Sequence, residues 1–193
     1  MGVQDPAFIC PTDGGNYLTC PGYFGHIEMA RPVFYIQYLN TILKILRVVC
    51  YKCSKLLISK SKYIDILDGL SNESRWNKVF ALASKITRCG DDCDTGCGCK
   101  QPKSIKKEGL ATLIASWENL NGETKENVTL HLNCEMVLKI LSRISDEDTE
   151  FMGFSSSFSR PEWMICQVFA VPPPCVRPSV KHDAQQRLSL IHI

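Results

Sequence analysis

Three short stretches decide the fold: Arg160–Ile165 (RPEWMI), Val171–Pro174 (VPPP) and Val176–Pro178 (VRP). An apolar run from Trp163 to Val171 lies between these proline clusters. Proline lacks a backbone donor and fixes φ, and it pushes the preceding residue toward extended geometry. The segment therefore predicts one buried strand that continues into a stiff, extended arm. Such an arm suits a spacer or a hinge better than a catalytic loop.

The longest helix signal lies upstream of this strand. Pro32 is well placed as the first residue of a helix, because the missing amide hydrogen is not needed there. Apolar residues then recur at spacings of three and four from Val33 to Val49, which predicts an amphipathic helix. The helix is expected to end at the Cys50–Cys53 segment, CYKC.

The rest of the chain mixes helices and strands without a regular strand–helix–strand alternation. Asn133 is expected to cap a helix from Cys134 to Ile144. Gly, Pro and Cys enrich residues 1–31, and Cys, Gly and Asp enrich residues 89–101, so both segments are expected to be loops. This mixture predicts an α+β fold. The further elements expected are helices at Lys62–Leu70, Glu73–Thr87 and Asp146–Met152, and strands at Leu110–Trp117 and Val128–Leu132.

Length and charge exclude little. The chain has 193 residues and a formal net charge of +2, which permits one sizeable core or two small ones and does not by itself indicate nucleic acid. No apolar run reaches membrane-spanning length, so no membrane partner is expected. The local basic run of Lys100, Lys103, Lys106 and Lys107 is most simply a solvated loop.

The eleven cysteines are the strongest chemical signal. Their number is odd, and residues 1–10 show neither the basic nor the apolar region of an export signal. Metal binding is therefore a better interpretation than a disulfide framework. The alternative, free cysteines that behave as small hydrophobic residues, suits Cys134 and Cys166, which lie in apolar helix and strand patterns.

One group of cysteines has metal-ligand spacing. Cys50 and Cys53 form a C-x2-C pair, and two thiolates at this spacing can bind one side of a tetrahedral Zn²⁺ ion. Two of the four cysteines in the loop that follows would complete the site. Four thiolates leave no position for a substrate water, so the metal would be structural. The candidates in that loop are Cys89, Cys93, Cys97 and Cys99.

A second group near the N-terminus is weaker. Cys10 and Cys20 supply two thiols, His26 an imidazole, and Asp13 a carboxylate that is a poorer ligand than sulfur. A degenerate metal site is one interpretation. The other is a loop held together by packing of its aromatic side chains, Tyr17, Tyr23 and Phe24.

Several motifs resemble one known family over nearly the whole chain and in the expected order. They include Cys20–Glu28 (CPGYFGHIE), Arg31–Phe34 (RPVF), Cys50–Leu57 (CYKCSKLL), and the stretch from Arg160 to Val180. This pattern is similar to the largest subunit of multisubunit DNA-directed RNA polymerases of the polymerase II type. The resemblance implies an α+β zinc-binding clamp region that is incomplete as a stand-alone domain.

The resemblance also assigns ligands. It selects a four-cysteine zinc site, and it implies a second zinc site near the N-terminus that departs from the family pattern. The family has cysteine where Asp13 stands and histidine where Tyr23 stands. The main site is assigned to Cys50, Cys53, Cys89 and Cys97, and the degenerate one to Cys10, Asp13, Cys20 and His26.

The same resemblance suggests three segments. Residues 1–31 would form the knuckle-like loop, residues 32–187 the clamp core, and residues 188–193 a non-native tail, because the family pattern stops after Arg187. The acidic family loop that holds Mg²⁺ is absent from this sequence. We therefore expect the fragment alone to be inactive, and Mg²⁺ to belong only to the full-length enzyme.

The function implied is that of a structural clamp region that closes over template DNA and nascent RNA during transcription. Its partners would be the other polymerase subunits and, through the complex, DNA and RNA. Its location would be the nucleus for a cellular enzyme, or host cytoplasm, nucleus or virion for a viral one. The alternative is a free-standing zinc-binding protein-interaction module, although cross-brace modules need eight regularly spaced ligands.

Overall fold

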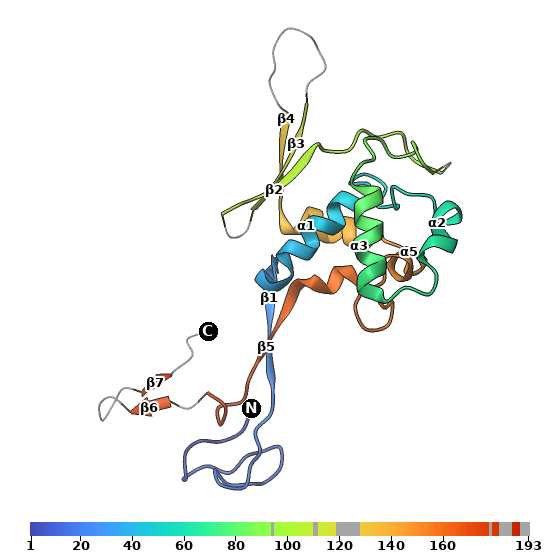
Figure 1. Ribbon diagram of the computed structural model, residues 1–193. Helices are drawn as coiled ribbons and strands as arrows, with labels where there is room; N and C mark the ends of the chain where they lie inside the picture. The colour runs from blue at the N-terminus through green and yellow to red at the C-terminus, as the bar shows by residue number, and fades with distance from the viewer. Residues whose placement is uncertain (94, 110–111, 119–127, 178, 182–186, 190–193) are drawn as a thin grey trace. The chain divides into compact units, whose positions relative to one another are not determined.

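The computed structural model describes residues 1–93, 95–109, 112–118, 128–177, 179–181 and 187–189 (Figure 1). The chain forms two compact units: one comprises Met1–Ala30 with Gln167–Ile193, and the other comprises Arg31–Cys166. The boundary between the units after Ala30 lies close to residue 31, where the N-terminal loop segment was expected to end. Residues 167–187, which were expected to belong to the core segment, group with the N-terminal residues.

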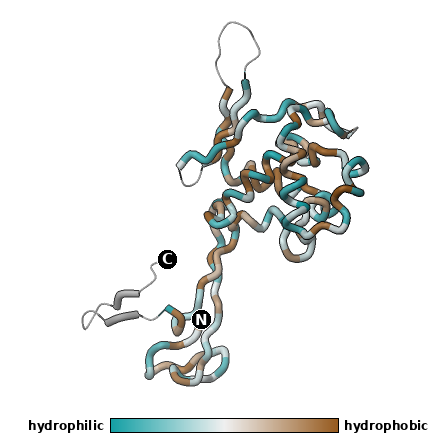
Figure 2. Tube along the Cα trace, in the orientation of Figure 1, coloured by the Kyte–Doolittle hydropathy of each residue, from teal (hydrophilic) through white to brown (hydrophobic). Residues whose placement is uncertain are grey.

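The core of the larger unit is built around α1 (Leu39–Val48). Leu39, Ile42 and Ile45 are buried at spacings of three, as the apolar periodicity predicts. This face of α1 packs against α3 (Asn72–Ala83), which buries Val79 and Ala83. Figure 2 shows hydrophobic segments along the helices of this unit, interleaved with hydrophilic ones. Burial of side chains of this size stabilises the fold by about 1.5–3 kcal/mol each.

The predicted helix start at Pro32 is wrong. Pro32 lies in β1 (Gly25–Phe34), which pairs with β5 (Ile165–Val171). A short 3-10 helix, η1 (Ile36–Tyr38), then precedes α1. The apolar pattern continues through the strand and the helix alike, so periodicity alone misplaced the boundary. The boundary is instead set by the pairing of β1 with β5, a segment more than a hundred residues away.

The proline-flanked apolar run is also shorter and more exposed as a strand than predicted. Residues Pro161–Met164 form a second 3-10 helix, η2, and Trp163 is 51% exposed. The strand β5 begins only at Ile165, and its residues 167–170 are exposed. The expectation of one fully buried strand from Trp163 is therefore wrong. A two-stranded pairing leaves the faces of β5 without a second layer over most of its length.

A three-stranded antiparallel sheet follows the cysteine loop. Its order is β2 (Ser104–Glu108), β3 (Thr112–Trp117) and β4 (Val128–Leu132), with Ile105 opposite Ala115 and Ala115 opposite Leu130. The predicted strands β3 and β4 are confirmed, although residues 110–111 lie outside the described part of the chain. The strand β2 was missed, because its lysines predicted a solvated loop. Ile105 is buried and Lys106 and Lys107 are exposed, so the second half of the basic run lies in an edge strand with one inward side chain.

The remaining helices are close to their predicted positions. They are α2 (Lys60–Leu67), α3, α4 (Cys134–Leu141) and α5 (Asp146–Phe151). The predicted cap is confirmed, because Asn133 Oδ1 accepts a hydrogen bond of 2.8 Å from the Met136 amide. The fold is therefore α+β, as expected. Among the described residues, no helix is long and apolar enough to cross a membrane.

The end of the described chain is a small hairpin of β6 (Ser179–Lys181) and β7 (Arg187–Ser189). Val180 stands opposite Leu188, and Ser179 opposite Ser189. Leu188 and Ser189 thus pair with Val180 and Ser179, while the assignment of residues 188–193 as a non-native tail stays a prediction. Residues 190–193 lie outside the described part of the chain.

Candidate metal centre

The first half of the centre is a tight turn that follows α1. The Cys50 amide donates to Lys55 O at 2.9 Å, and the Ser54 amide donates to Cys50 O at 2.8 Å. Ser54 adopts a left-handed conformation with φ of 60°, which closes the turn. The C-x2-C segment is thus folded back on itself. This backbone places the thiols of Cys50 and Cys53 on one side.

The second half is the glycine-rich loop that follows α3. The Cys89 amide donates to Cys99 O at 2.9 Å, and the Gly98 amide donates to Cys89 O at 2.8 Å. A Cβ atom on Gly96 would lie only 2.3 Å from Gly90 Cα, so the two strands of the loop can approach this closely only without a side chain at this position. The glycines therefore allow the loop to present Cys89 and Cys97 together.

An acidic residue holds this loop against α2. Asp92 Oδ2 accepts a hydrogen bond of 2.9 Å from the Ser59 amide, and Asp92 Oδ1 forms an ion pair of 2.8 Å with Lys62 Nζ. The bonds from Lys62 and from the Ser59 amide lower the pKa of the Asp92 carboxyl. Asp92 therefore gives the predicted loop of residues 89–101 a structural contact with the start of α2.

The two halves converge on a group of four sulfur atoms. Cys50 Sγ lies 3.6 Å from Cys97 Sγ, and Cys53 Sγ lies 3.7 Å from Cys89 Sγ. All four sulfurs lie within 4.8 Å of one another. Four sulfurs at 2.3 Å from a tetrahedral Zn²⁺ ion would be about 3.8 Å apart. The donor set and its dimensions therefore fit zinc, while zinc binding itself stays a prediction.

The competing cysteines of the loop do not join this group. Cys93 Sγ donates to Leu56 O at 3.8 Å, and Cys99 Sγ bonds with the Tyr51 hydroxyl at 3.3 Å. The geometry thus selects Cys89 and Cys97, the pair that the family resemblance had selected. Cys134 lies half-buried at the start of α4, outside the group.

Burial sets the protonation of the metal-free centre. Cys50 and Cys89 are fully buried, and burial raises the pKa of the Cys89 thiol well above its ordinary value. The hydrogen bond with Cys99 raises the pKa of Tyr51 to about 12. A metal ion would therefore have to displace the proton of the Cys89 thiol, which makes its binding pH-dependent.

The N-terminal group brings together three of the four predicted residues. Ligand atoms of Cys10, Asp13 and Cys20 lie within 4.8 Å of one another, and Cys10 is buried. His26 is not one of this group; it lies exposed in β1. The structure therefore offers two sulfurs and one carboxylate at this place.

The carboxylate of this group already has partners. Asp13 Oδ1 accepts a hydrogen bond of 2.8 Å from the Gly15 amide, and Asp13 Oδ2 accepts one of 2.9 Å from the Tyr23 hydroxyl. The bond to Gly15 first, then one from the Cys20 thiol and the one from Tyr23, lower the pKa of Asp13 to about 2. The bond to Asp13 raises the pKa of Tyr23, so the phenol stays a neutral donor. Asp13 and Tyr23, the two positions where this chain departs from the family ligands, thus bind each other.

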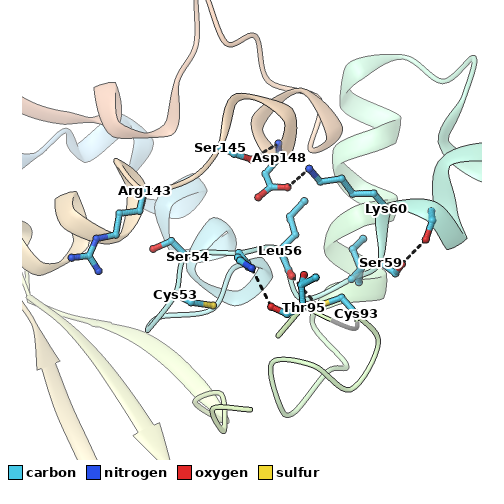
Figure 3. A pocket seen from close by; sticks show the side chains of 13 residues that line it. Cys53, Ser54, Leu56, Ser59, Lys60, Cys93, Thr95, Arg143, Ser145 and Asp148 are labelled. Atoms are coloured by element: carbon cyan, nitrogen blue, oxygen red, sulfur yellow. Dashed lines mark hydrogen bonds and ion pairs between the residues drawn. The ribbon is translucent and has the colours of Figure 1, made fainter. Parts of the chain in front are cut away.

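A pocket of about 600 Å³, lined by polar and apolar residues, includes Cys53 of the four-cysteine group (Figure 3). Two lysines of its lining already have partners. Lys60 Nζ forms an ion pair of 2.6 Å with Asp148 Oδ1, and Lys55 Nζ donates to Thr95 O at 3.1 Å. The described lining offers no nucleophile hydrogen-bonded to a base. The pocket therefore gives no indication of an active site.

Sequence reasoning missed one residue of the centre. Gln101 is 7% exposed, and its amide nitrogen lies 3.2 Å from Cys50 Sγ. The sequence places Gln101 four residues after Cys97, in a cysteine-rich loop. That position does not specify which sulfur the side chain contacts.

Two comparisons with known proteins agree. The family model described as RNA polymerase Rpb1, domain 1, matches residues 1–189. A relative from Euplotoides octocarinatus, named DNA-directed RNA polymerase II subunit RPB1, is 37% identical over 188 residues. This alignment covers 93% of the present chain and 39% of the relative, so the chain spans well under half of the relative's length.

Proposed function

Because the chain belongs to the RNA polymerase Rpb1 domain 1 family, we propose that it is the clamp region of a DNA-directed RNA polymerase largest subunit. In this role it closes over template DNA and nascent RNA during transcription. Its partners are the other subunits of the polymerase, and its location is the nucleus if the source is cellular. The family match over residues 1–189 is the observation that carries this proposal.

Structural zinc stiffens the region. Cys50, Cys53, Cys89 and Cys97 hold the ion as thiolates, which leaves no position for a reacting water. The ion joins the end of α1 to the loop after α3, and its binding free energy therefore adds to folding. The convergence of the four sulfurs within 4.8 Å supports this role.

Contact with nucleic acid is electrostatic. The lysines of the edge strand β2, with Lys106 and Lys107 exposed, bind phosphates without reading bases. Lys103 is paired with Glu118 and therefore contributes less charge to this surface. Mg²⁺ and the chemistry of nucleotide addition belong to parts of the enzyme outside this sequence.

Purification from the source cell tests this proposal. A tagged form of the gene product should co-purify with other polymerase subunits and with template-dependent RNA synthesis. The isolated chain of 193 residues should incorporate no nucleotides, because it lacks the acidic Mg²⁺ loop. Recovery without any other polymerase subunit would refute the proposal, and nucleotide incorporation by the isolated chain would refute its structural role.

The alternative of a free-standing zinc-binding interaction module is not favoured. Among the described residues, one group offers four sulfurs and the other only three ligand atoms. A cross-brace module needs eight ligands in two complete sites.

A further inference from the structure

Gln101 is a buried polar side chain with three hydrogen bonds beside the four-cysteine group. Its Nε2 donates to Cys50 Sγ at 3.2 Å and to Cys99 O at 3.0 Å. Its Oε1 accepts a bond of 3.4 Å from the Tyr51 amide. Both hydrogens of the amide nitrogen therefore have acceptors, and the oxygen has a donor.

These partners fix the orientation of the amide. In the flipped orientation, Oε1 would face a carbonyl oxygen and a sulfur, and the amide nitrogen would face the Tyr51 amide. The oxygen would then face two acceptors and the amide nitrogen a donor, which is unfavourable in a buried site. Only the observed orientation satisfies all of the groups. It directs an N–H at Cys50.

The backbone holds this side chain in place. The Gln101 amide donates to Thr87 O at 2.7 Å, and the Lys103 amide donates to Ser116 O at 2.8 Å. Residues 101–103 are thus anchored to Thr87, just before the cysteine loop, and to β3. The Gln101 side chain reaches a sulfur that is 51 residues away in sequence.

We propose that Gln101 is a positioning residue of the metal centre, which donates a hydrogen bond to the Cys50 thiolate and thereby increases zinc affinity. This inference rests on the proposed zinc site. Four thiolates and one Zn²⁺ carry a net charge of −2, and Cys50 is fully buried. A fixed N–H donor offsets part of that charge where water does not reach.

The first measurement is zinc affinity of the 193-residue chain by competition with a chromogenic chelator. Gln101→Met removes the donor at similar size, and Gln101→Glu keeps the acceptor for the Tyr51 amide but replaces the donor with a carboxylate. We expect a loss of about 10- to 100-fold for Gln101→Met, and a larger loss for Gln101→Glu. Gln37→Met, the same change at an exposed glutamine in η1, should leave the affinity unchanged.

The second measurement separates donation from packing. With Co²⁺ in place of zinc, loss of the N–H donor raises the energy of the sulfur lone pairs. The sulfur-to-metal charge-transfer band should therefore move to longer wavelength in Gln101→Met. A side chain that only fills space would change thermal stability without moving this band.

The outcomes distinguish the two proposals. A wild-type chain that binds no zinc would refute the zinc site itself. A wild-type chain that binds zinc, with Gln101 variants of equal affinity and an unmoved cobalt band, would refute the role of Gln101 alone. If Gln101→Met does not fold, Gln101→Glu decides, and retained wild-type affinity in that folded variant would overturn the inference.

Discussion

The four-cysteine group and the N-terminal group are both built from hydrogen-bonded loops but differ in their donors. The first joins two hydrogen-bonded loops that are distant in sequence, the second is a single local loop, and each brings its ligand atoms within 4.8 Å of one another. The first supplies four sulfurs, whereas the second supplies two sulfurs and a carboxylate whose oxygens both have protein partners. Loop geometry therefore gathers potential ligands, and the donor set decides whether a metal can replace their existing bonds.

The largest effect expected from this comparison is loss of zinc on Cys53→Ser. Wild-type protein should contain close to one equivalent, and this variant should lose it together with the folding of the Arg31–Cys166 unit. Structural zinc supplies about 10–16 kcal/mol of apparent binding free energy, as much as the whole net stability of a domain. Metal analysis and a circular dichroism melt measure both.

The matched control is Cys134→Ser, which changes a half-buried cysteine outside the group. It should retain its zinc. Equal zinc content in wild type and Cys53→Ser would contradict the assignment of the main site.

A second, smaller effect tests the N-terminal group. Cys20→Ser should largely retain the single equivalent, because two thiols and an engaged carboxylate hold metal weakly. The double variant Asp13→Cys with Tyr23→His should gain a second equivalent, because it supplies three sulfurs and one nitrogen. Metal analysis of the single variant Asp13→Cys provides the control. A wild-type chain with two tightly bound equivalents would show that the comparison is wrong.

Features set by residues close together in sequence were predicted better than contacts between residues far apart in sequence. The C-x2-C pair and the Asn133 cap are local signals, and both placed their residues correctly. Choosing Cys97 over Cys99 needed the family resemblance, because spacing alone left both open. Gln101 was not predictable, because its contact joins residues 51 positions apart.

The errors in the fold have the same origin. Pro32 was assigned to a helix because its local pattern permits one, whereas pairing of β1 with β5 makes it part of a strand. The strand β2 was missed because the lysines within it and just before it predict solvent exposure. Its register with β3, with Lys106 opposite Ile114, is set by the neighbouring strand.

A third prediction isolates the bond that replaces metal ligation in the N-terminal group. Tyr23→Phe removes the hydroxyl that donates to Asp13 Oδ2. We expect faster amide hydrogen exchange around Gly15 and no change in zinc content, because the four-cysteine group is not involved. Unchanged exchange at Gly15 would show that the bond does not hold the loop.

The smallest effect concerns pH. The Asp13 pKa is lowered to about 2, so its contribution to stability is fully present above the unfolded value, about 3.9, and is lost as pH falls through about 2. The side-chain carbon resonance of Asp13 should therefore titrate near pH 2 and not near pH 4. Titration at the ordinary value would mean that the bonds from Gly15, Cys20 and Tyr23 do not persist in solution.

The long sequence separations within the four-cysteine group have a kinetic consequence. Cys50 and Cys97 are 47 residues apart, and Cys53 and Cys89 are 36 apart. An ion bound early by the local C-x2-C pair gains its other two ligands only when the intervening chain, with α2 and α3, has formed a closed loop. Four-thiolate coordination would then form at the folding rate of this region. The rate at which the spectrum of bound Co²⁺ changes would therefore report the rate of loop closure.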